Sequence, residues 1–122
     1  MPETNRPDLA WLGRHVQVSI DRPLGSLHPV HGHVHPVNYG FIPGTMADDG
    51  SEVDAYLLGP TEAVASGAGV VVAIVHRLDD VEDKLLVLAD GHSPIRSDDL
   101  MGLVDFQERW YDTRLITAEP PA

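Results

Sequence analysis

Short apolar runs, separated by glycine, proline and polar residues, recur along the first three quarters of the chain. The longest run, residues 68–75, suits a buried strand. Runs of this length bounded by turn residues predict strands rather than helices. We expect strands at residues 15–21, 37–42, 53–58, 69–76 and 84–88. Five short strands suit a small barrel.

The spacing of apolar residues changes after Ser97, which is a good helix N-cap followed by two aspartates in the first turn. A helix to about Leu115 is therefore predicted, packed against the barrel. Its apolar face would comprise Leu100, Leu103, Val104, Gln107, Trp110 and Tyr111. The pattern predicts a mainly β (α+β) fold in a single domain, residues 1–122, with a core at about 14–115.

Composition narrows the class of protein. The formal net charge is −11, so a general nucleic-acid-binding surface is not expected. The same charge repels a polyanionic substrate unless cations reverse the local field, which favours a cation-dependent site. There is no cysteine, which excludes disulfide and thiolate chemistry. No run reaches the length of a membrane span, and a cytoplasmic protein is expected.

Two acidic segments are candidates for chemistry. In the first, DGSEVD, Asp49 precedes a glycine turn and Asp54 enters a predicted strand. Hard divalent cations such as magnesium take oxygen ligands and often share a few carboxylates with a phosphate. A solvated acidic turn is the alternative interpretation, and by spacing alone it is the commoner one.

The second segment carries Asp79, Asp80, Glu82 and Asp83 in the connection between two predicted strands, with Lys84 at its exit. If those strands pair with the strand after Asp54, both acidic segments meet at one end of a sheet. Carboxylates that meet in this way repel one another, and bound cations relieve the repulsion. A charged hairpin tip is the competing explanation, because turns favour aspartate.

The strings PVNYGFIPGT and DGSEVDA, and the later acidic segment that ends in DKL, resemble the metal-dependent soluble inorganic pyrophosphatase family in a shortened form. The resemblance spans roughly residues 16–111. It implies an OB-like barrel with a flanking helix, magnesium as the cofactor, with manganese as a substitute, and hydrolysis of pyrophosphate to two phosphates. Members of the family often assemble, so a homo-oligomer is also implied, although no feature of the sequence specifies an interface.

Carried over position by position, the resemblance makes Asp49 and Asp54 metal ligands, with Asp54 also catalytic. Ser51 stands where the family has the carboxylate credited with helping to deprotonate the attacking water. A serine hydroxyl is no base near neutral pH, so Glu52 is the nearest substitute.

Tyr39 matches the family tyrosine beside the substrate phosphates, and Asp21 matches an outer carboxylate on the first strand. A core tyrosine and an edge-strand charge before Pro23 are the alternatives from residue type alone.

The later acids align less closely with the family. A one-residue deletion pairs Asp79 with Asp83 as metal ligands, keeps Glu82 in reserve and makes Lys84 a phosphate contact. Near the carboxyl end, Trp110 and Tyr111 stand where the family has a tyrosine and a phosphate-binding lysine. Arg109 is the candidate to replace that lysine.

Between Asp21 and Val37 the chain is too short for the hairpin with which the family grips the departing phosphate. Arg22 and His28 are candidate replacements in substrate binding. His31, His33 and His35 alternate and would share one face of an extended segment, a pattern that can bind zinc or nickel. Gly32 and Pro36 favour an irregular loop with exposed histidines instead.

The leading hypothesis from sequence is thus magnesium-dependent hydrolysis of pyrophosphate. Two alternatives remain open: a weak or inactive pyrophosphatase-like module that binds metal or phosphate, and a hydrolase of another diphosphate. Ser51, the missing lysine and the missing hairpin motivate the first alternative. The second is motivated by the shortened rim, which leaves room for a larger substrate.

Overall fold

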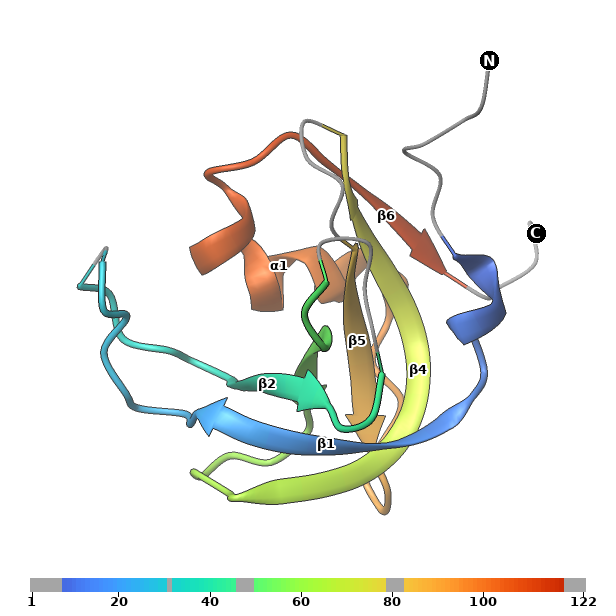
Figure 1. The fold of residues 1–122 in the computed structure, drawn as a ribbon, viewed down its shortest axis with the longest axis horizontal. Helices are drawn as coiled ribbons and strands as arrows, with labels where there is room; N and C mark the ends of the chain where they lie inside the picture. The colour runs from blue at the N-terminus through green and yellow to red at the C-terminus, as the bar shows by residue number, and fades with distance from the viewer. Residues whose placement is uncertain (1–7, 31, 46–49, 79–82, 118–122) are drawn as a thin grey trace.

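A computed structural model describes residues 8–30, 32–45, 50–78 and 83–117. Six strands, one α-helix and a short 3-10 helix make up the described chain (Figure 1). In chain order they are η1 (Leu9–Trp11), β1 (His15–Arg22), β2 (Asn38–Ile42), β3 (Val53–Leu58), β4 (Ser66–Arg77), β5 (Asp83–Ala89), α1 (Ser97–Glu108) and β6 (Thr113–Thr117).

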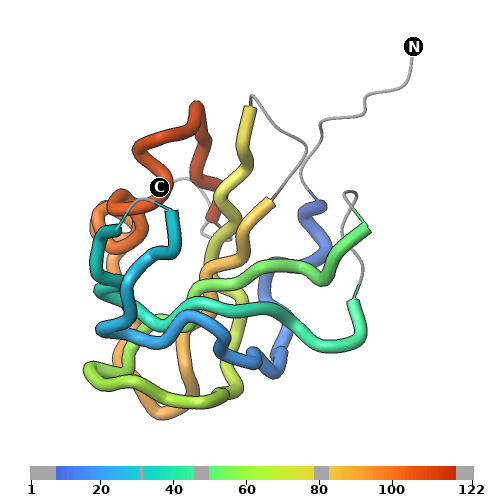
Figure 2. Tube along the Cα trace, turned by 60° about the vertical axis from the view of Figure 1, so that its left-hand side comes forward, coloured from blue at the N-terminus to red at the C-terminus, as the bar shows by residue number. Residues whose placement is uncertain are grey.

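The strands form one sheet with the order β1-β2-β3-β5-β4-β6, and an additional pairing of β1 with β4 closes five of them into a barrel. The long strand β4 makes this closure possible. Its first residues pair with β1, and its last residues pair with β6. Figure 1 shows β1 and β4 curving around the barrel, and Figure 2 shows the same wall from the side. The predicted OB-like barrel with a flanking helix is confirmed.

Alternation along the strands separates two apolar clusters. On β3, Val53, Ala55 and Leu57 belong to one cluster, whereas Tyr56 and Leu58 belong to the other. The second cluster also contains Leu100 and Val104 of α1. One face of the sheet thus packs against α1, because successive side chains of a strand point to opposite faces.

The predicted helix end is wrong. Helix α1 stops at Glu108, and a turn leads into β6, which pairs antiparallel with the end of β4. The segment TRLIT is rich in β-branched residues and completes the outer edge of β4. Helical spacing of apolar residues therefore continued past Glu108 without a helix, because tertiary pairing with β4 overrides it.

Residues 23–30 and 32–37 belong to an extended excursion between β1 and β2, which we call the arm (left in Figure 1). Within the arm, Leu27 and Val34 form a β-bridge. The backbone N–H of Gly25 donates to the carbonyl of His35 at 2.8 Å, and the N–H of His28 donates to that of His33 at 2.8 Å. The described part of the arm is thus an irregular loop whose two sides are joined by one β-bridge and these hydrogen bonds.

Among the described residues, no helix combines the length and the apolar character that a bilayer crossing requires.

Candidate functional site

A polar cavity of about 250 Å³ lies beneath the carboxyl end of α1. Every strand of the closed barrel contributes to its wall, together with the arm and the helix end. The lining residues are Arg22, His28, Tyr39, Asp54, Arg77, Lys84, Gln107, Trp110 and Tyr111. Arginine and lysine side chains from three strands thus meet in one cavity of a protein whose net charge is −11.

Strand register explains why residues far apart in sequence meet here. Asp54 of β3 lies opposite Phe41 of β2, two residues from Tyr39, and opposite Lys84 of the parallel strand β5. Lys84 in turn lies opposite Val75 of β4, two residues before Arg77. Because side chains two residues apart share a face, these four polar residues point to the same side of the sheet. The pairing of the apolar strands therefore fixes the relative positions of the polar side chains in the cavity.

Lys84 and Asp54 form an ion pair at the centre of the cavity. The Lys84 side chain is 5% exposed, and its ammonium lies 5.7 Å from the centre of the Tyr39 ring. Burial by itself lowers the pKa of Lys84, but Tyr39 and Asp54 beside it outweigh this effect and hold the pKa above its usual range. Lys84 is accordingly charged at neutral pH.

Tyr39 keeps its proton for a similar reason. Burial raises the pKa of the Tyr39 hydroxyl to about 12, with Lys84 acting in the opposite direction. A protonated tyrosine hydroxyl in a cationic cavity can donate a hydrogen bond to an anionic oxygen. At neutral pH the cavity thus contains a hydrogen-bond donor, the Tyr39 hydroxyl, beside the positive charge of Lys84.

A buried network holds Arg77 in place. Its Nε and Nη2 donate to the two carboxylate oxygens of Glu108, each at 3.0 Å. The Tyr56 hydroxyl donates to Glu108 at 2.6 Å and accepts from Gln107 Nε2 at 2.7 Å. The guanidinium carbon of Arg77 lies 3.6 Å from the centre of the Tyr111 ring. A bidentate pair of this kind fixes the orientation of the guanidinium as well as its charge.

The sequence pattern does not point to four residues of this network, which are Arg77, Glu108, Tyr56 and Gln107. The signal for Glu108 was available, because it lies four and eight residues after Val104 and Leu100 and therefore shares their buried helix face. A carboxylate on such a face predicts a buried cation partner. For Arg77, the signal was a guanidinium directly after a buried apolar strand.

Four of the predicted site residues do not line the described cavity. Glu52 is exposed, and its carboxylate accepts from the N–H of Gly44 at 3.3 Å. Asp21 is exposed on β1. Arg109 donates to Asp105 at 2.9 Å on the helix surface. Asp83, at the start of β5, accepts at 2.6 Å from Nδ1 of His76.

Three predicted metal ligands, Asp49, Asp79 and Glu82, lie outside the described residues. Asp54 and Lys84 are the second residues of the parallel strands β3 and β5 and lie opposite each other at the same end of the sheet. Within the described ranges, no three histidine, aspartate or glutamate side chains are arranged to hold a metal ion.

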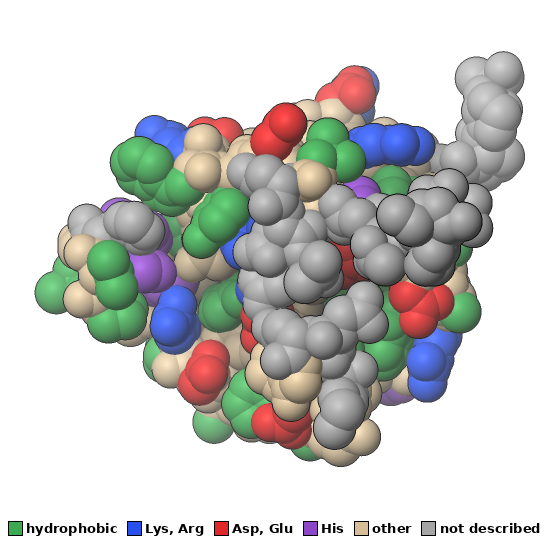
Figure 3. All heavy atoms as spheres, turned by 45° about the horizontal axis from the view of Figure 1, so that its top comes forward, with side chains coloured by type: hydrophobic (Ala, Val, Ile, Leu, Met, Phe, Trp, Pro, Cys, Tyr) green, Lys and Arg blue, Asp and Glu red, His purple; other side chains and the backbone are tan. Residues whose placement is uncertain are grey.

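The described histidines of the arm form a cluster of rings. The predicted metal triplet of His31, His33 and His35 stays a prediction, because His31 lies outside the described residues. Ring centres of His28, His33 and His35 lie between 4.7 and 5.8 Å apart. His33 and His35 also meet the edge of Phe106 of α1, each at 5.3 Å. Figure 3 shows histidine side chains gathered at this end of the molecule. This ring cluster joins the arm to the helix, and His28 lies in the wall of the polar cavity.

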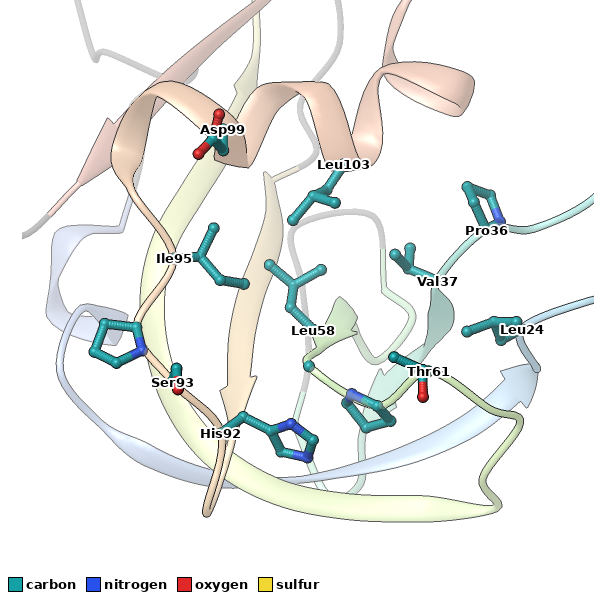
Figure 4. A pocket seen from close by; sticks show the side chains of 13 residues that line it. Leu24, Pro36, Val37, Leu58, Thr61, His92, Ser93, Ile95, Asp99 and Leu103 are labelled. Atoms are coloured by element: carbon teal, nitrogen blue, oxygen red, sulfur yellow. The ribbon is translucent and has the colours of Figure 1, made fainter.

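A larger cavity, of about 760 Å³, lies between the start of α1 and the far ends of β2 and β3 (Figure 4). Its wall is mainly apolar, with Val37, Leu58, Ile95 and Leu103 pointing inward. No lysine or arginine of the described chain lines it. It is therefore less suited to phosphate than the polar cavity.

Comparison with known proteins agrees with this geometry. Residues 14–113 match the family described as inorganic pyrophosphatase. A protein named inorganic pyrophosphatase from Caulobacter vibrioides is 44% identical over 57 residues, which cover 43% of this chain and 32% of that protein. Another of that name from Aeropyrum pernix is 43% identical over 51 residues, covering 42% of this chain and 28% of that protein. The matched segments thus span about a third of the length of these curated relatives.

The fold has a close counterpart among solved structures. The crystal structure of inorganic pyrophosphatase from Ehrlichia chaffeensis superimposes with a TM-score of 0.68, at 18% sequence identity, covering 94% of this chain and 91% of that one. A sequence identity of this level supports the fold alone. The family match is independent evidence, because it covers nearly all of the described barrel and helix. This chain therefore belongs to the inorganic pyrophosphatase family.

Proposed function

We propose that this chain hydrolyses inorganic pyrophosphate to two phosphates in a magnesium-dependent reaction. The observation that carries the proposal is the polar cavity, where Arg22, Arg77 and Lys84 surround Tyr39 and Asp54. Positive groups placed around a phosphoryl group before it reacts stabilise the charge that develops in the transition state. Family membership supports the same reaction.

The described residues divide into two roles in this proposal. Arg77 and Lys84 bind phosphate oxygens, with Arg22 and His28 on the side of the arm. Tyr39 donates its hydroxyl proton in a hydrogen bond to one of those oxygens. Glu108 is a positioning residue, because it fixes Arg77 and does not line the cavity itself.

Asp54 fits a magnesium ion that is shared with the substrate. It is the one carboxylate among the described lining residues, and its side chain is 28% exposed. Magnesium commonly takes one or two carboxylates together with phosphate oxygens and water. When bound, the ion would supply an acidified water and neutralise phosphoryl charge. Asp49, Asp79, Glu82 and Asp83 are the further ligands we propose, with manganese as the substitute ion.

The test is phosphate release from pyrophosphate by the purified chain, with magnesium, manganese and a chelator compared. Asp54→Asn keeps an acceptor for Lys84 and should lower the magnesium-dependent rate at least about 100-fold while the circular dichroism spectrum stays unchanged. Asp90→Asn, which changes an exposed aspartate directly after the end of β5, is the matched control. Asp54→Asn at near-full rate would overturn the assignment.

A non-catalytic module that binds metal or phosphate is the second candidate, because Ser51 replaces a family carboxylate and Glu52 does not line the described cavity. Calorimetric binding of magnesium and pyrophosphate without phosphate release would favour it. A cytoplasmic location and a homo-oligomer stay predictions.

A further inference from the structure

The wall of the polar cavity contains aromatic surface that a pyrophosphate ion does not need. Trp110 lines the cavity and is 58% exposed, and Tyr111 beside it is 36% exposed. Large aromatic side chains are normally buried, and an exposed one in the wall of a charged cavity is a common platform for stacking a flat ring. The position of Trp110 thus adds a second kind of recognition to the cationic wall.

The turn that carries Trp110 is fixed on both sides. The backbone N–H of Tyr111 donates to the carbonyl of Glu108 at 3.0 Å. The N–H of Leu78 donates to the carbonyl of Asp112 at 2.7 Å, which ties the turn to the end of β4. Arg77 lies over the Tyr111 ring at 3.6 Å. A platform held in this way loses little conformational entropy when a ligand stacks on it.

We propose that, besides pyrophosphate, this cavity takes a second substrate class, a diphosphate that carries a planar aromatic group. A nucleoside diphosphate is the type case, with Trp110 stacking on the ring. The inference rests on the proposed function, since it takes Arg22, Arg77 and Lys84 as the phosphate-binding groups. A small anion would contact only the three cationic side chains and not Trp110. An uncharged ring would contact Trp110 and not the cations. A ligand with both parts uses the whole wall.

The reaction needs no reactant other than water. With ADP, the water oxygen bonds to the terminal phosphorus, and the bond from that phosphorus to the bridging oxygen breaks. The bridging oxygen leaves with AMP, and the products are AMP, phosphate and one proton. No oxidation or reduction takes place.

The experiment uses the full chain with Trp11→Phe as the background, so that Trp110 becomes the single tryptophan. Trp11 lies in η1 and does not line the polar cavity. ADP, methyl diphosphate and pyrophosphate are compared with magnesium present. We expect ADP to quench the Trp110 fluorescence and methyl diphosphate to leave it largely unchanged.

In steady-state assays, Trp110→Ala should lower kcat/KM for ADP relative to methyl diphosphate about tenfold, and Trp110→Phe should restore most of this ratio. Equal losses for both substrates, or no ring-dependent quenching, would overturn the inference while pyrophosphate hydrolysis stands. Ring-dependent quenching without phosphate release from any of the three compounds would instead overturn hydrolysis and keep the aromatic recognition.

Discussion

Arg77 and Glu108 form a bidentate ion pair in the interior, with side-chain exposures of 5% and 0%. The pair joins the last residue of β4 to the last residue of α1. Desolvating two charges is costly, and the pair offsets that cost only while both partners remain. The relationship thus ties the stability of the fold to the orientation of a group in the polar cavity.

Removing one charge of this pair should therefore be strongly destabilising. Glu108→Gln leaves the Arg77 guanidinium buried without its counter-ion, and we expect a loss of about 3 to 5 kcal/mol in the free energy of unfolding, measured by urea titration. Asp105→Asn, which breaks an exposed pair with Arg109 on the same helix, is the matched control and should cost at most about 1 kcal/mol. Equal effects of the two variants would contradict the assigned role.

His35 should make the fold sensitive to acid. Burial, reinforced by His33, Arg22 and His28, lowers the pKa of His35 from 6.5 to about 4. The folded state then binds fewer protons than the unfolded state, so the stability present above pH 6.5 is lost as the pH falls toward 4. The pKa difference corresponds to a loss of about 3 kcal/mol at pH 4.

The measurement for His35 is the urea midpoint at pH 7 and pH 4.5 for the parent and His35→Phe, which keeps an aromatic ring but cannot titrate. The variant should lose much less stability between the two pH values. His15→Asn, at an exposed position paired with Asp90, is the control. Parallel behaviour of parent and His35→Phe would show that other groups carry the acid sensitivity.

Two glycine-to-alanine substitutions should have opposite effects. A Cβ on Gly40 would lie 1.8 Å from the backbone oxygen of Ser19, so the substitution forces β1 and β2 apart. We expect a loss of about 2 kcal/mol or more in stability. At Gly102, inside α1, a Cβ meets nothing within 4 Å, and alanine should stabilise by about 0.5 to 1 kcal/mol. Thermal unfolding of both variants checks the pair, and a neutral Gly40→Ala would refute the close approach.

Ser51→Asp tests whether the family position for a base keeps its geometry. Ser51 is exposed just before β3, so a carboxylate fits there without burial cost. We expect pyrophosphate turnover to be preserved or raised. A large fall in kcat, with Glu52→Asp as a comparison that changes the neighbouring acid, would mean that the site is built around serine.

Pattern and resemblance predicted much of this molecule. The five barrel strands follow from short apolar runs, because the barrel buries one side of each strand and α1 covers the other side of several of them. Helical spacing at Trp110 and Tyr111 misled the prediction of the helix end, since pairing with β4 decides the conformation of residues 113–117. Local patterns carry no information on such long-range pairing.

The sequence likewise predicts some residues of the polar cavity and misses others. Tyr39, Asp54 and Lys84 lie on strands whose alternation and motif both indicate one face, and the structure brings them together. Arg77 and Glu108 depend on a contact between β4 and α1 that sequence spacing does not reveal. Arg109 was chosen by charge, whereas its helical position directs it to Asp105 on the surface.

The arm has a consequence for how this protein can diverge. It leaves and re-enters the barrel between β1 and β2. Edge-on contacts of His33 and His35 with Phe106 join it to α1, and it takes no part in the strand pairing that closes the barrel. Residues can therefore be added to or removed from the arm without shifting the pairing of any barrel strand. His28 lies in the wall of the polar cavity. Such changes would therefore alter the size of the substrate that the cavity accepts, while the barrel keeps its structure.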